Sequence, residues 1–523
     1  MARSIAEKLK VTGTLVTQAP LSVGGMGGDV DVDLALARDG QGRLYVPGTS
    51  LTGPIREWVR RAFDETLADL LFGYQKDDKG NASYAIVDDV IIDIPEDFIE
   101  VRDGVGIDRK LGTAAERAKY DRAVLPRGTR FPFAMSVELP LNLEDRLRLK
   151  SCVGHLLQAM QEKKKLGLGA ARTRGLGWIC LESLSVEAED WATRCGILKV
   201  LRGSGSKVTL SDLIQSQPAP KVLPRLDIVI EWMAKGPVMV KAAAEGVAVD
   251  MLPLVSRMGS DRYALVLPGS GIKGALRGQA ERIIRTVLDL DVTGDFLKDV
   301  QVPLVEYIFG SAKSQKDRGR KDNEVEETEE KPKSGKPAGK GALLVDDCYG
   351  TNAFSRVQWN DITTAKDESA LRSTLNAAGL TKTQQAFHVA VDRWTGGAAE
   401  HFLYNILEPF GCEWEPMRLS LDLDRLPEDL GLPALALLFL LMRDLAGESI
   451  PIGFAANRGM GIIKISNITL TGSGLNGKLS PLDGTHPLSS VDFPGVDKTF
   501  LANLESVWTT WIDQTVAQGQ GEG

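Results

Sequence analysis

The sequence predicts an α+β protein made of two tandem copies of one module. The first observation is that five short motifs occur twice along the 523-residue chain, in the same order. PGTSLTGPIR, from Pro47, matches PGSGIKGALR, from Pro268, and GLGAARTRGLG, from Gly167, matches IGFAANRGMG, from Ile452. The second observation is that apolar residues follow the same succession of strand and helix periods in both copies. A duplicated module therefore determines the architecture.

The spacing between matched motifs locates insertions in the second copy. The PG motifs lie 268 − 47 = 221 residues apart, whereas the arginines of the glycine-rich loops lie 458 − 174 = 284 residues apart. One insertion coincides with 312–341, which is polar, charged and predicted to be disordered. The other falls within 351–385, where we expect a short helix near residues 368–378. Insertions of this kind in loops leave a duplicated core intact.

The first copy alternates between strand and helix patterns. Alternating residues predict strands over 11–23 and 31–38, and a helix then follows the PGTS turn with Ser50 as its N-cap. One face of this helix is apolar and carries Leu51, Ile55, Val59, Ala62 and Phe63. Further strands are expected at 85–92, 130–138 and 176–184, with a helix over 143–162 before the last one. This order is ferredoxin-like, as in RNA-recognition modules.

These patterns divide the chain into four parts. We expect the first module over residues 1–188, a linker over 189–222, the second module over 223–471 and a tail over 472–523. The tail ends in an expected helix over 496–516 with Phe500, Leu504 and Trp508 on one side. That apolar side is expected to dock on its own module or, alternatively, on a partner subunit.

Composition restricts the possible functions. The formal net charge is −8, so nucleic-acid binding would require local basic patches. Five cysteines without a CxxC motif argue against structural zinc and fit a reducing cytoplasm. The N-terminus has no apolar signal core, and the longest apolar run, from Leu432, is too short to span a bilayer and predicts a core helix. We therefore expect a cytoplasmic protein without membrane contact.

The glycine-rich loops suit anion binding. Glycines allow the backbone to turn its amides toward a ligand, and arginine forks match phosphate oxygens. Phosphate contacts are therefore expected from both loops, at Gly169, Arg172, Arg174, Gly175, Gly177, Gly453, Asn457, Arg458, Gly459 and Gly461. Charge before the first loop comes from Lys163, Lys164 and Lys165. The alternatives are a tight turn with a salt-bridging arginine and a solvated helix end.

Each PG motif places a helix N-terminus where unpaired amides and the positive end of the dipole favour anions. Donors at these two helix starts are Gly48, Thr49, Ser50, Arg56, Gly269, Ser270, Lys273 and Arg277. Ordinary N-capping is the alternative, and both roles can coexist.

Taken together, the motifs resemble the RAMP superfamily of CRISPR-associated proteins, specifically backbone subunits of type III effector complexes. The similarity covers nearly all of both copies, and two fused copies resemble the double-backbone subunit of type III-D variants. The resemblance implies that the glycine-rich loops and helix starts hold guide-RNA phosphates. It also implies thumb hairpins over 108–116 and 392–400 that kink the guide–target duplex at every sixth nucleotide, near Arg109, Arg117, Arg393 and His401. The implied partners are guide RNA, target RNA, other RAMP subunits and a large signalling subunit.

The resemblance further implies that a loop aspartate before each PG turn cuts target RNA. Asp33 and Asp250 match best, in the contexts VDVD and VAVD, with Asp29 and Asp31 as alternates. A carboxylate there could bind Mg²⁺ or Mn²⁺, or orient a ribose 2′-hydroxyl. A calcium loop is excluded because Leu34 stands where that loop needs glycine. Two alternatives are a non-catalytic scaffold and a guide-processing endoribonuclease, although no histidine pairs convincingly with a nucleophile.

Overall fold

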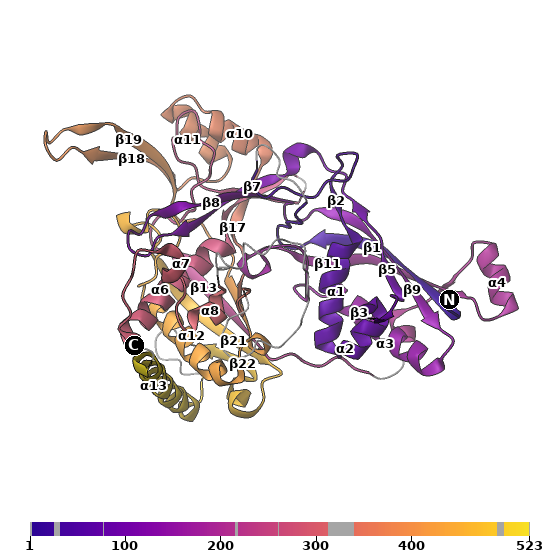
Figure 1. Ribbon diagram of the computed structural model, residues 1–523. Coiled ribbons are helices and arrows are strands. Elements are labelled where there is room, and N and C mark those ends of the chain that lie inside the picture. Colours follow the sequence, from indigo (N-terminus) through magenta and orange to yellow (C-terminus); the bar gives the residue numbers. More distant parts are fainter. Residues whose placement is uncertain are drawn as a thin grey trace. The chain divides into compact units, whose positions relative to one another are not determined.

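The computed structural model describes residues 3–25, 32–76, 78–214, 218–259, 261–311, 339–488 and 496–521 (Figure 1). Asp29, Asp31 and residues 312–338 of the expected insertion lie outside these ranges. The chain forms two compact units. Unit 1 comprises Met1–Arg102, Tyr120–Arg172 and Leu176–Leu223, and unit 2 comprises Asp103–Lys119, Thr173–Gly175 and Pro224–Gly523. Two short segments of the first repeat therefore belong to unit 2.

Unit 1 is built on an antiparallel sheet. Its central strand β1 (Ile5–Thr17) pairs with β9 (Arg130–Pro140) on one side and β11 (Trp178–Asp190) on the other. The outer strands are β5 (Ala85–Val87) on β9, and β10 (Leu166–Gly167) and β12 (Ser206–Lys207) on β11. Alternate residues of β9 are buried, because one face of the sheet covers the core.

Helices cover the apolar face of this sheet. The expected apolar face of α1 (Gly48–Ala62) is buried, as predicted, and packs in one cluster with residues of α2 (Glu65–Phe72) and α3 (Leu143–Gln161). The prediction that Ser50 caps α1 is wrong, because the helix already begins at Gly48. The Gly48 N–H donates instead to the Asp89 carboxylate, 2.7 Å away, so another segment caps this helix.

Smaller elements complete this half of the chain. The strand pairs are β2 (Tyr45–Val46) with β6 (Val90–Ile91), β3 (Tyr74–Lys76) with β4 (Lys79–Asn81), and β7 (Glu100–Ile107) with β8 (Ala114–Val124). The short helices are η1 (Glu96–Phe98), η2 (Arg172–Arg174), α4 (Arg194–Leu201) and α5 (Leu210–Leu213). The expected linker thus contains regular structure. Residues 32–38 make isolated bridges rather than the continuous strand that we expected.

Unit 2 repeats the sheet. Here β13 (Arg225–Ala234) lies between β20 (Met417–Asp422) and β21 (Ile463–Ser473), with β16 (Leu343–Val345) and β22 (Gly484–Leu488) outside. All four pairings are antiparallel. The order β16-β20-β13-β21 matches β5-β9-β1-β11 of unit 1, strand for strand along the sequence.

The helices of this second core follow the predicted patterns. Buried residues of α6 (Gly269–Leu288), α8 (Val305–Phe309) and α12 (Gly431–Ala446) pack in one cluster with the sheet, so the apolar run from Leu432 is a core helix. Phe500 and Leu504 of α13 (Lys498–Gly521) are buried in the same cluster, and the tail helix therefore docks on its own unit. Short helices are α7 (Phe296–Asp299), η3 (Leu423–Arg425), η4 (Glu428–Leu430), η5 (Ala456–Arg458) and η6 (Gly477–Leu482).

A second small sheet and a hairpin complete unit 2. The sheet has the order β14 (Val255–Met258), β15 (Arg262–Leu267), β17 (Cys348–Ser355), followed in sequence by α10 (Arg356–Thr364) and the predicted short helix α11 (Glu368–Ala377). Strands β18 (Thr383–Val391) and β19 (Ala398–Pro409) form a hairpin that extends outward from unit 2 (Figure 1). Among the described residues, no helix combines the length and the apolar character that crossing a membrane requires.

Candidate functional site

The two glycine-rich loops have the same backbone conformation. Each contains a 3₁₀ turn, η2 or η5, and each has positive φ at four matched positions. The φ values are 73°, 55°, 90° and 88° at Gly169, Ala171, Gly175 and Gly177, and 95°, 54°, 88° and 84° at Gly453, Ala455, Gly459 and Gly461. The repeated sequence therefore builds the same turn twice.

Close packing explains most of these glycines. A Cβ on Gly169 would lie 2.3 Å from the Ser22 carbonyl oxygen, and one on Gly453 would lie 2.2 Å from that of Met239. The Gly177 and Gly461 amides donate to chain carbonyls at 2.8 and 3.0 Å. Backbone amides at these two positions are therefore not open to a ligand, which corrects the expectation of an anion-binding nest there.

The loops do differ at one position. A Cβ on Gly175 would lie 2.2 Å from an oxygen of the Asp347 carboxylate, whereas one on Gly459 would meet nothing within 4 Å. Gly175 is buried and Gly459 is exposed. A contact between the loop backbone and phosphate is therefore sterically possible at Gly459 and excluded at Gly175 in this structure.

The exposed charges of the loops are their arginines. Arg174 and Arg458 are both exposed, and the Arg458 guanidinium donates to the Tyr404 hydroxyl and lies 5.8 Å from the centre of its ring. Arg172 is half-buried and donates to the Gly167 carbonyl at 3.0 Å. Asn457 is exposed as well. The expected phosphate contacts of the loops therefore depend on guanidinium groups more than on amides.

The lysines before the first loop lie largely at the surface. Lys163 and Lys165 are exposed and Lys164 is half-buried. The Lys165 ammonium lies 3.7 Å from the Glu162 carboxylate, an exposed pairing that contributes little to stability. Their positive charge is therefore available for long-range attraction of an anion.

The two helix starts are already capped by carboxylates. Gly48 and Gly269 donate their N–H groups to Asp89 and Asp347 at 2.7 and 2.8 Å. A Cβ on either glycine would lie 2.2 Å from a carbonyl oxygen of the neighbouring strand, at Val87 or Val345. Anion binding by these two amides is therefore a wrong prediction, because a carboxylate occupies the position and would repel phosphate. The side chains of Thr49 and Ser270 are exposed, and Ser50 is half-buried.

Three cations of these helices serve the fold. Arg56 pairs with Asp69 at 2.5 Å. Arg277 pairs with Glu281 at 2.7 Å and donates to two main-chain carbonyls. Lys273 is 5% exposed, and its ammonium donates to the Leu343 carbonyl at 2.6 Å. Burial, reinforced by nearby positive charge, lowers the pKa of Lys273 to about 7.

The expectation that Lys273 and Arg277 contact RNA is therefore wrong. Their donors are used by carbonyls and a carboxylate of the same unit, and moving either side chain to a phosphate would leave those acceptors unpaired. Arg56 is intermediate in exposure but is likewise paired, with Asp69. Charge alone had marked these residues as ligand-binding.

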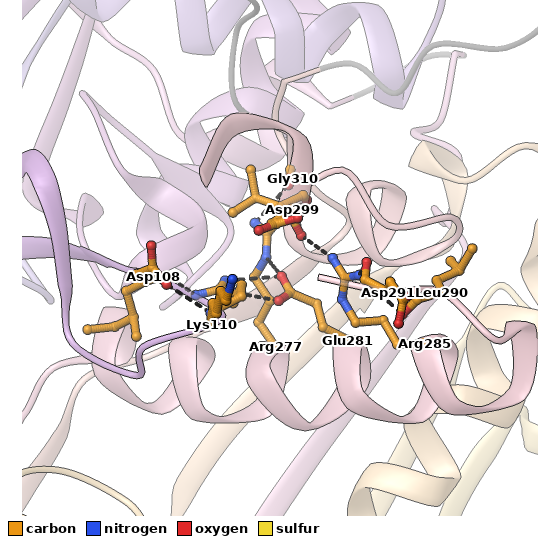
Figure 2. Close-up of polar contacts among 12 residues, drawn as sticks. Asp108, Lys110, Arg277, Glu281, Arg285, Leu290, Asp291, Asp299 and Gly310 are labelled. Carbon is orange, nitrogen blue, oxygen red and sulfur yellow. Dashed lines mark hydrogen bonds and ion pairs between the residues drawn. The ribbon is translucent and has the colours of Figure 1, made fainter. Parts of the chain in front are cut away.

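The first expected thumb segment is the turn between β7 and β8, and it lies against α6 in unit 2 (Figure 2). Arg109 makes a two-contact ion pair with Glu281, with Nη2 3.0 Å from Oε1. Asp108 closes the turn by accepting from the amides of Lys110 and Leu111 at 2.8 and 2.7 Å. Since the side chain of Arg109 is only 19% exposed and paired, the prediction that it contacts RNA is wrong.

The second expected thumb segment is the turn of the β18–β19 hairpin. Arg393, the counterpart of Arg109, is exposed there, next to Trp394, which is 96% exposed. Arg117, in β8, is exposed and has a φ of 56°. The side chain of His401 lies outside the described part of the molecule.

The two candidate catalytic aspartates have equivalent surroundings. The Asp33 N–H donates to Asp121 Oδ1 at 2.6 Å, and the Asp121 N–H donates to Asp33 Oδ2 at 3.0 Å. In unit 2 the Asp250 N–H donates to Asn405 Oδ1 at 3.0 Å, and the Asn405 N–H donates to Asp250 Oδ2 at 2.8 Å. Asp121 and Asn405 are 405 − 121 = 284 residues apart, the offset of the glycine-rich loops. Sequence reasoning missed both partners, although this offset relates them.

Both aspartates are exposed and have one oxygen engaged by an amide. Within the described ranges, Oδ1 of Asp33 and of Asp250 accepts no hydrogen bond from the protein. The same ranges contain no group of three or more His, Cys, Asp or Glu side chains arranged to hold a metal ion. A carboxylate oxygen suits Mg²⁺ or Mn²⁺, but its other ligands would have to be RNA oxygens and water.

The comparison with known protein families agrees with the duplicated architecture. The pattern of the RAMP superfamily matches residues 14–180 and, separately, 235–464. A search of curated proteins gave no significant match. The two matched regions contain both sheets, both glycine-rich loops and both aspartate pairs. Because these matches cover most of the chain, one in each repeat, the protein belongs to the RAMP superfamily, whose members are CRISPR-associated RNA-binding proteins.

Proposed function

We propose that this protein is a guide-RNA-binding backbone subunit of a type III CRISPR effector, of the III-D-like kind in which two backbone modules are fused. The proposed modules are ferredoxin-like and span residues 1–188 and 223–471, joined by 189–222 and followed by the tail 472–523. The matched strand orders and the two identical loop conformations support this proposal. Its partners would be guide RNA, target RNA, other RAMP subunits and the large signalling subunit.

Guide binding is proposed to depend on the exposed loop arginines. Arg174 and Arg458 occupy the same place in two turns of equal geometry, and each is exposed. Two such cations can hold phosphates at two points along one RNA strand. Phosphate contacts orient RNA without selecting its sequence, as a subunit that accepts many guides requires. Lys163, Lys165, Thr49 and Ser270 supply further exposed donors near these elements.

Target RNA cleavage is proposed for Asp33 and Asp250. The observation that carries this proposal is that both aspartates are held in the same way, by a reciprocal pair of hydrogen bonds, in two separate units. Two equivalent carboxylates fit two cuts in one target, spaced six nucleotides apart.

The chemistry proposed at each aspartate is attack by a ribose 2′-oxygen on the adjacent phosphorus. The bond between O2′ and phosphorus forms, the bond between phosphorus and O5′ breaks, and the hydroxyl proton is finally taken up by the leaving 5′-oxygen. Oδ1 of the aspartate would accept that proton or orient the hydroxyl. Bound Mg²⁺ or Mn²⁺ would supply charge stabilisation of the phosphate oxygens. Asp33 and Asp250 are the residues that would hold the ion.

The test is guided cleavage by the reconstituted complex, with Asp33→Ala and Asp250→Ala variants. Each substitution is expected to remove one of two cuts and to leave the other. If neither substitution changes the cutting, the protein is a non-catalytic scaffold for the same RNA. Incubation of the isolated protein with repeat RNA tests the third possibility, a guide-processing endoribonuclease, which this proposal predicts to be inactive here.

A further inference from the structure

We infer that Asp121 and Asn405 are positioning residues for Asp33 and Asp250, and that each acts through an acceptor oxygen rather than through charge. This inference rests on the proposed target RNA cleavage. It assigns a role to two side chains that the motifs of the sequence did not single out.

Each aspartate is tied to a strand by four hydrogen bonds. Besides the two reciprocal side-chain bonds, the Leu34 amide donates to the Asp121 carbonyl at 3.2 Å, and the Ala123 amide donates to the Leu34 carbonyl at 3.0 Å. These bonds fix the residue after Asp33 against β8. The side chain of Asp121 thus completes a connection that the backbone begins.

Unit 2 contains the same four bonds. The Met251 amide donates to the Asn405 carbonyl at 3.1 Å, and the Leu407 amide donates to the Met251 carbonyl at 3.0 Å. The strand here is β19, and the bridge between Met251 and Ile406 is parallel, as is the bridge between Leu34 and Arg122 in unit 1. An arrangement that recurs bond for bond in two separate units is not an accident of one loop.

The reciprocal bonds have a direct effect on the carboxylate. Because the Asp33 Oδ2 atom accepts from the Asp121 amide, the side chain is held in one rotamer and Oδ1 is presented in one direction. The bond in the opposite direction, from the Asp33 amide to Asp121 Oδ1, fixes the backbone of the aspartate itself. Misplacing a reacting group by about 1 Å can cost on the order of a hundredfold in rate.

The difference between the two units identifies the property that matters. The position is a carboxylate in unit 1 and an amide in unit 2, yet Oδ1 accepts the same bond in both. An acceptor oxygen is common to Asp121 and Asn405, whereas negative charge is not. A second metal-binding carboxylate would require charge in both units, which Asn405 does not supply.

The experiment measures single-turnover cleavage at saturating target RNA by the reconstituted complex, with each cut quantified separately. Asp121→Ala is expected to slow only the cut that Asp33→Ala abolishes, by about tenfold or more, and Asn405→Ala only the cut that Asp250→Ala abolishes. Asp121→Asn and Asn405→Asp, which keep the acceptor, are expected to cut at the unaltered rate. Affinity for target RNA is expected to stay unchanged in all four variants. The undisturbed cut in each variant controls for folding and assembly.

Three results would overturn the inference. If Asp121→Ala cuts at the full rate while Asp33→Ala does not cut, the positioning role fails and the proposed cleavage stands. If Asp121→Asn is as slow as Asp121→Ala, carboxylate charge is required, and the claim about the acceptor fails. If the unaltered complex makes no cut at all, the proposed cleavage and the positioning role fail together.

Discussion

Replacing Glu281 by alanine should destabilise unit 2 strongly. This carboxylate is buried, with 3% of its side chain exposed, and it pairs with two guanidinium groups, those of Arg109 and Arg277, which are themselves only 19% and 18% exposed. Removing the shared anion leaves two shielded cations without their counter-charge. Removing one member of a buried ion pair typically costs about 3–5 kcal/mol, and we expect a loss in the free energy of unfolding of about 3 kcal/mol here.

The measurement is urea denaturation of the full chain followed by amide hydrogen exchange in peptides of α6. Exchange confines the observation to unit 2, which matters because a chain of two units need not unfold in one step. The matched control is Glu65→Ala, which removes the same charge from a helix where Glu65 is 46% exposed and 3.7 Å from Arg56. That exposed pair should be worth less than about 1 kcal/mol.

A second comparison separates the two guanidinium groups. Arg109→Ala leaves Glu281 paired with Arg277, so its cost should lie between those of Glu281→Ala and the Glu65→Ala control. It should also increase hydrogen exchange in the turn between β7 and β8, which Arg109 connects to α6. If Glu281→Ala costs no more than Glu65→Ala, the ion pair does not anchor this turn, and the structural role given to Arg109 and Arg277 is wrong.

Three further predictions concern the loops and the buried lysine. Gly453→Ala should cost about 3 kcal/mol, because its Cβ would lie 2.2 Å from a carbonyl oxygen, whereas Gly459→Ala, with open space around it, should cost about 1 kcal/mol from its φ of 88° alone; thermal melting ranks the two, and equal costs would count against the packing argument. Arg174→Ala and Arg458→Ala should each weaken binding of two unrelated guide RNAs equally, and filter binding that found a loss for only one guide would contradict phosphate contact. Because burial lowers the pKa of Lys273 to about 7 from 10.5, the unfolded chain binds more protons between these values, so this residue makes stability rise with pH from about 7 upward; Lys273→Met should flatten that rise in urea titrations, and an unchanged slope would refute it.

Hydrophobic periodicity was sufficient to predict the main elements. The apolar face of α1 and the apolar run of α12 are buried as expected, because burying such a face is the main source of helix stability in a folded protein. The start of α1 was misplaced, because its cap is Asp89, 41 residues away, and not the local Ser50. The small sheet of β14, β15 and β17 was not predicted, since its strands are short and separated by more than eighty residues.

The candidate site was less predictable than the fold. Residue type suggested that Arg109, Arg277 and Lys273 bind RNA, but the partners that occupy them depend on tertiary structure: Glu281 is 172 residues from Arg109, and Leu343 is 70 residues from Lys273. The partners Asp121 and Asn405 were missed for the same reason. They carry no motif of their own, and only the 284-residue offset between the repeats connects them.

Guided cleavage of target RNA by the reconstituted complex tests the central claim most directly. The account predicts two cuts six nucleotides apart in Mg²⁺, of which Asp33→Ala removes one and Asp250→Ala the other, while the double variant binds RNA and cuts nothing. A double variant that still makes both cuts would show that these aspartates are not the source of the activity.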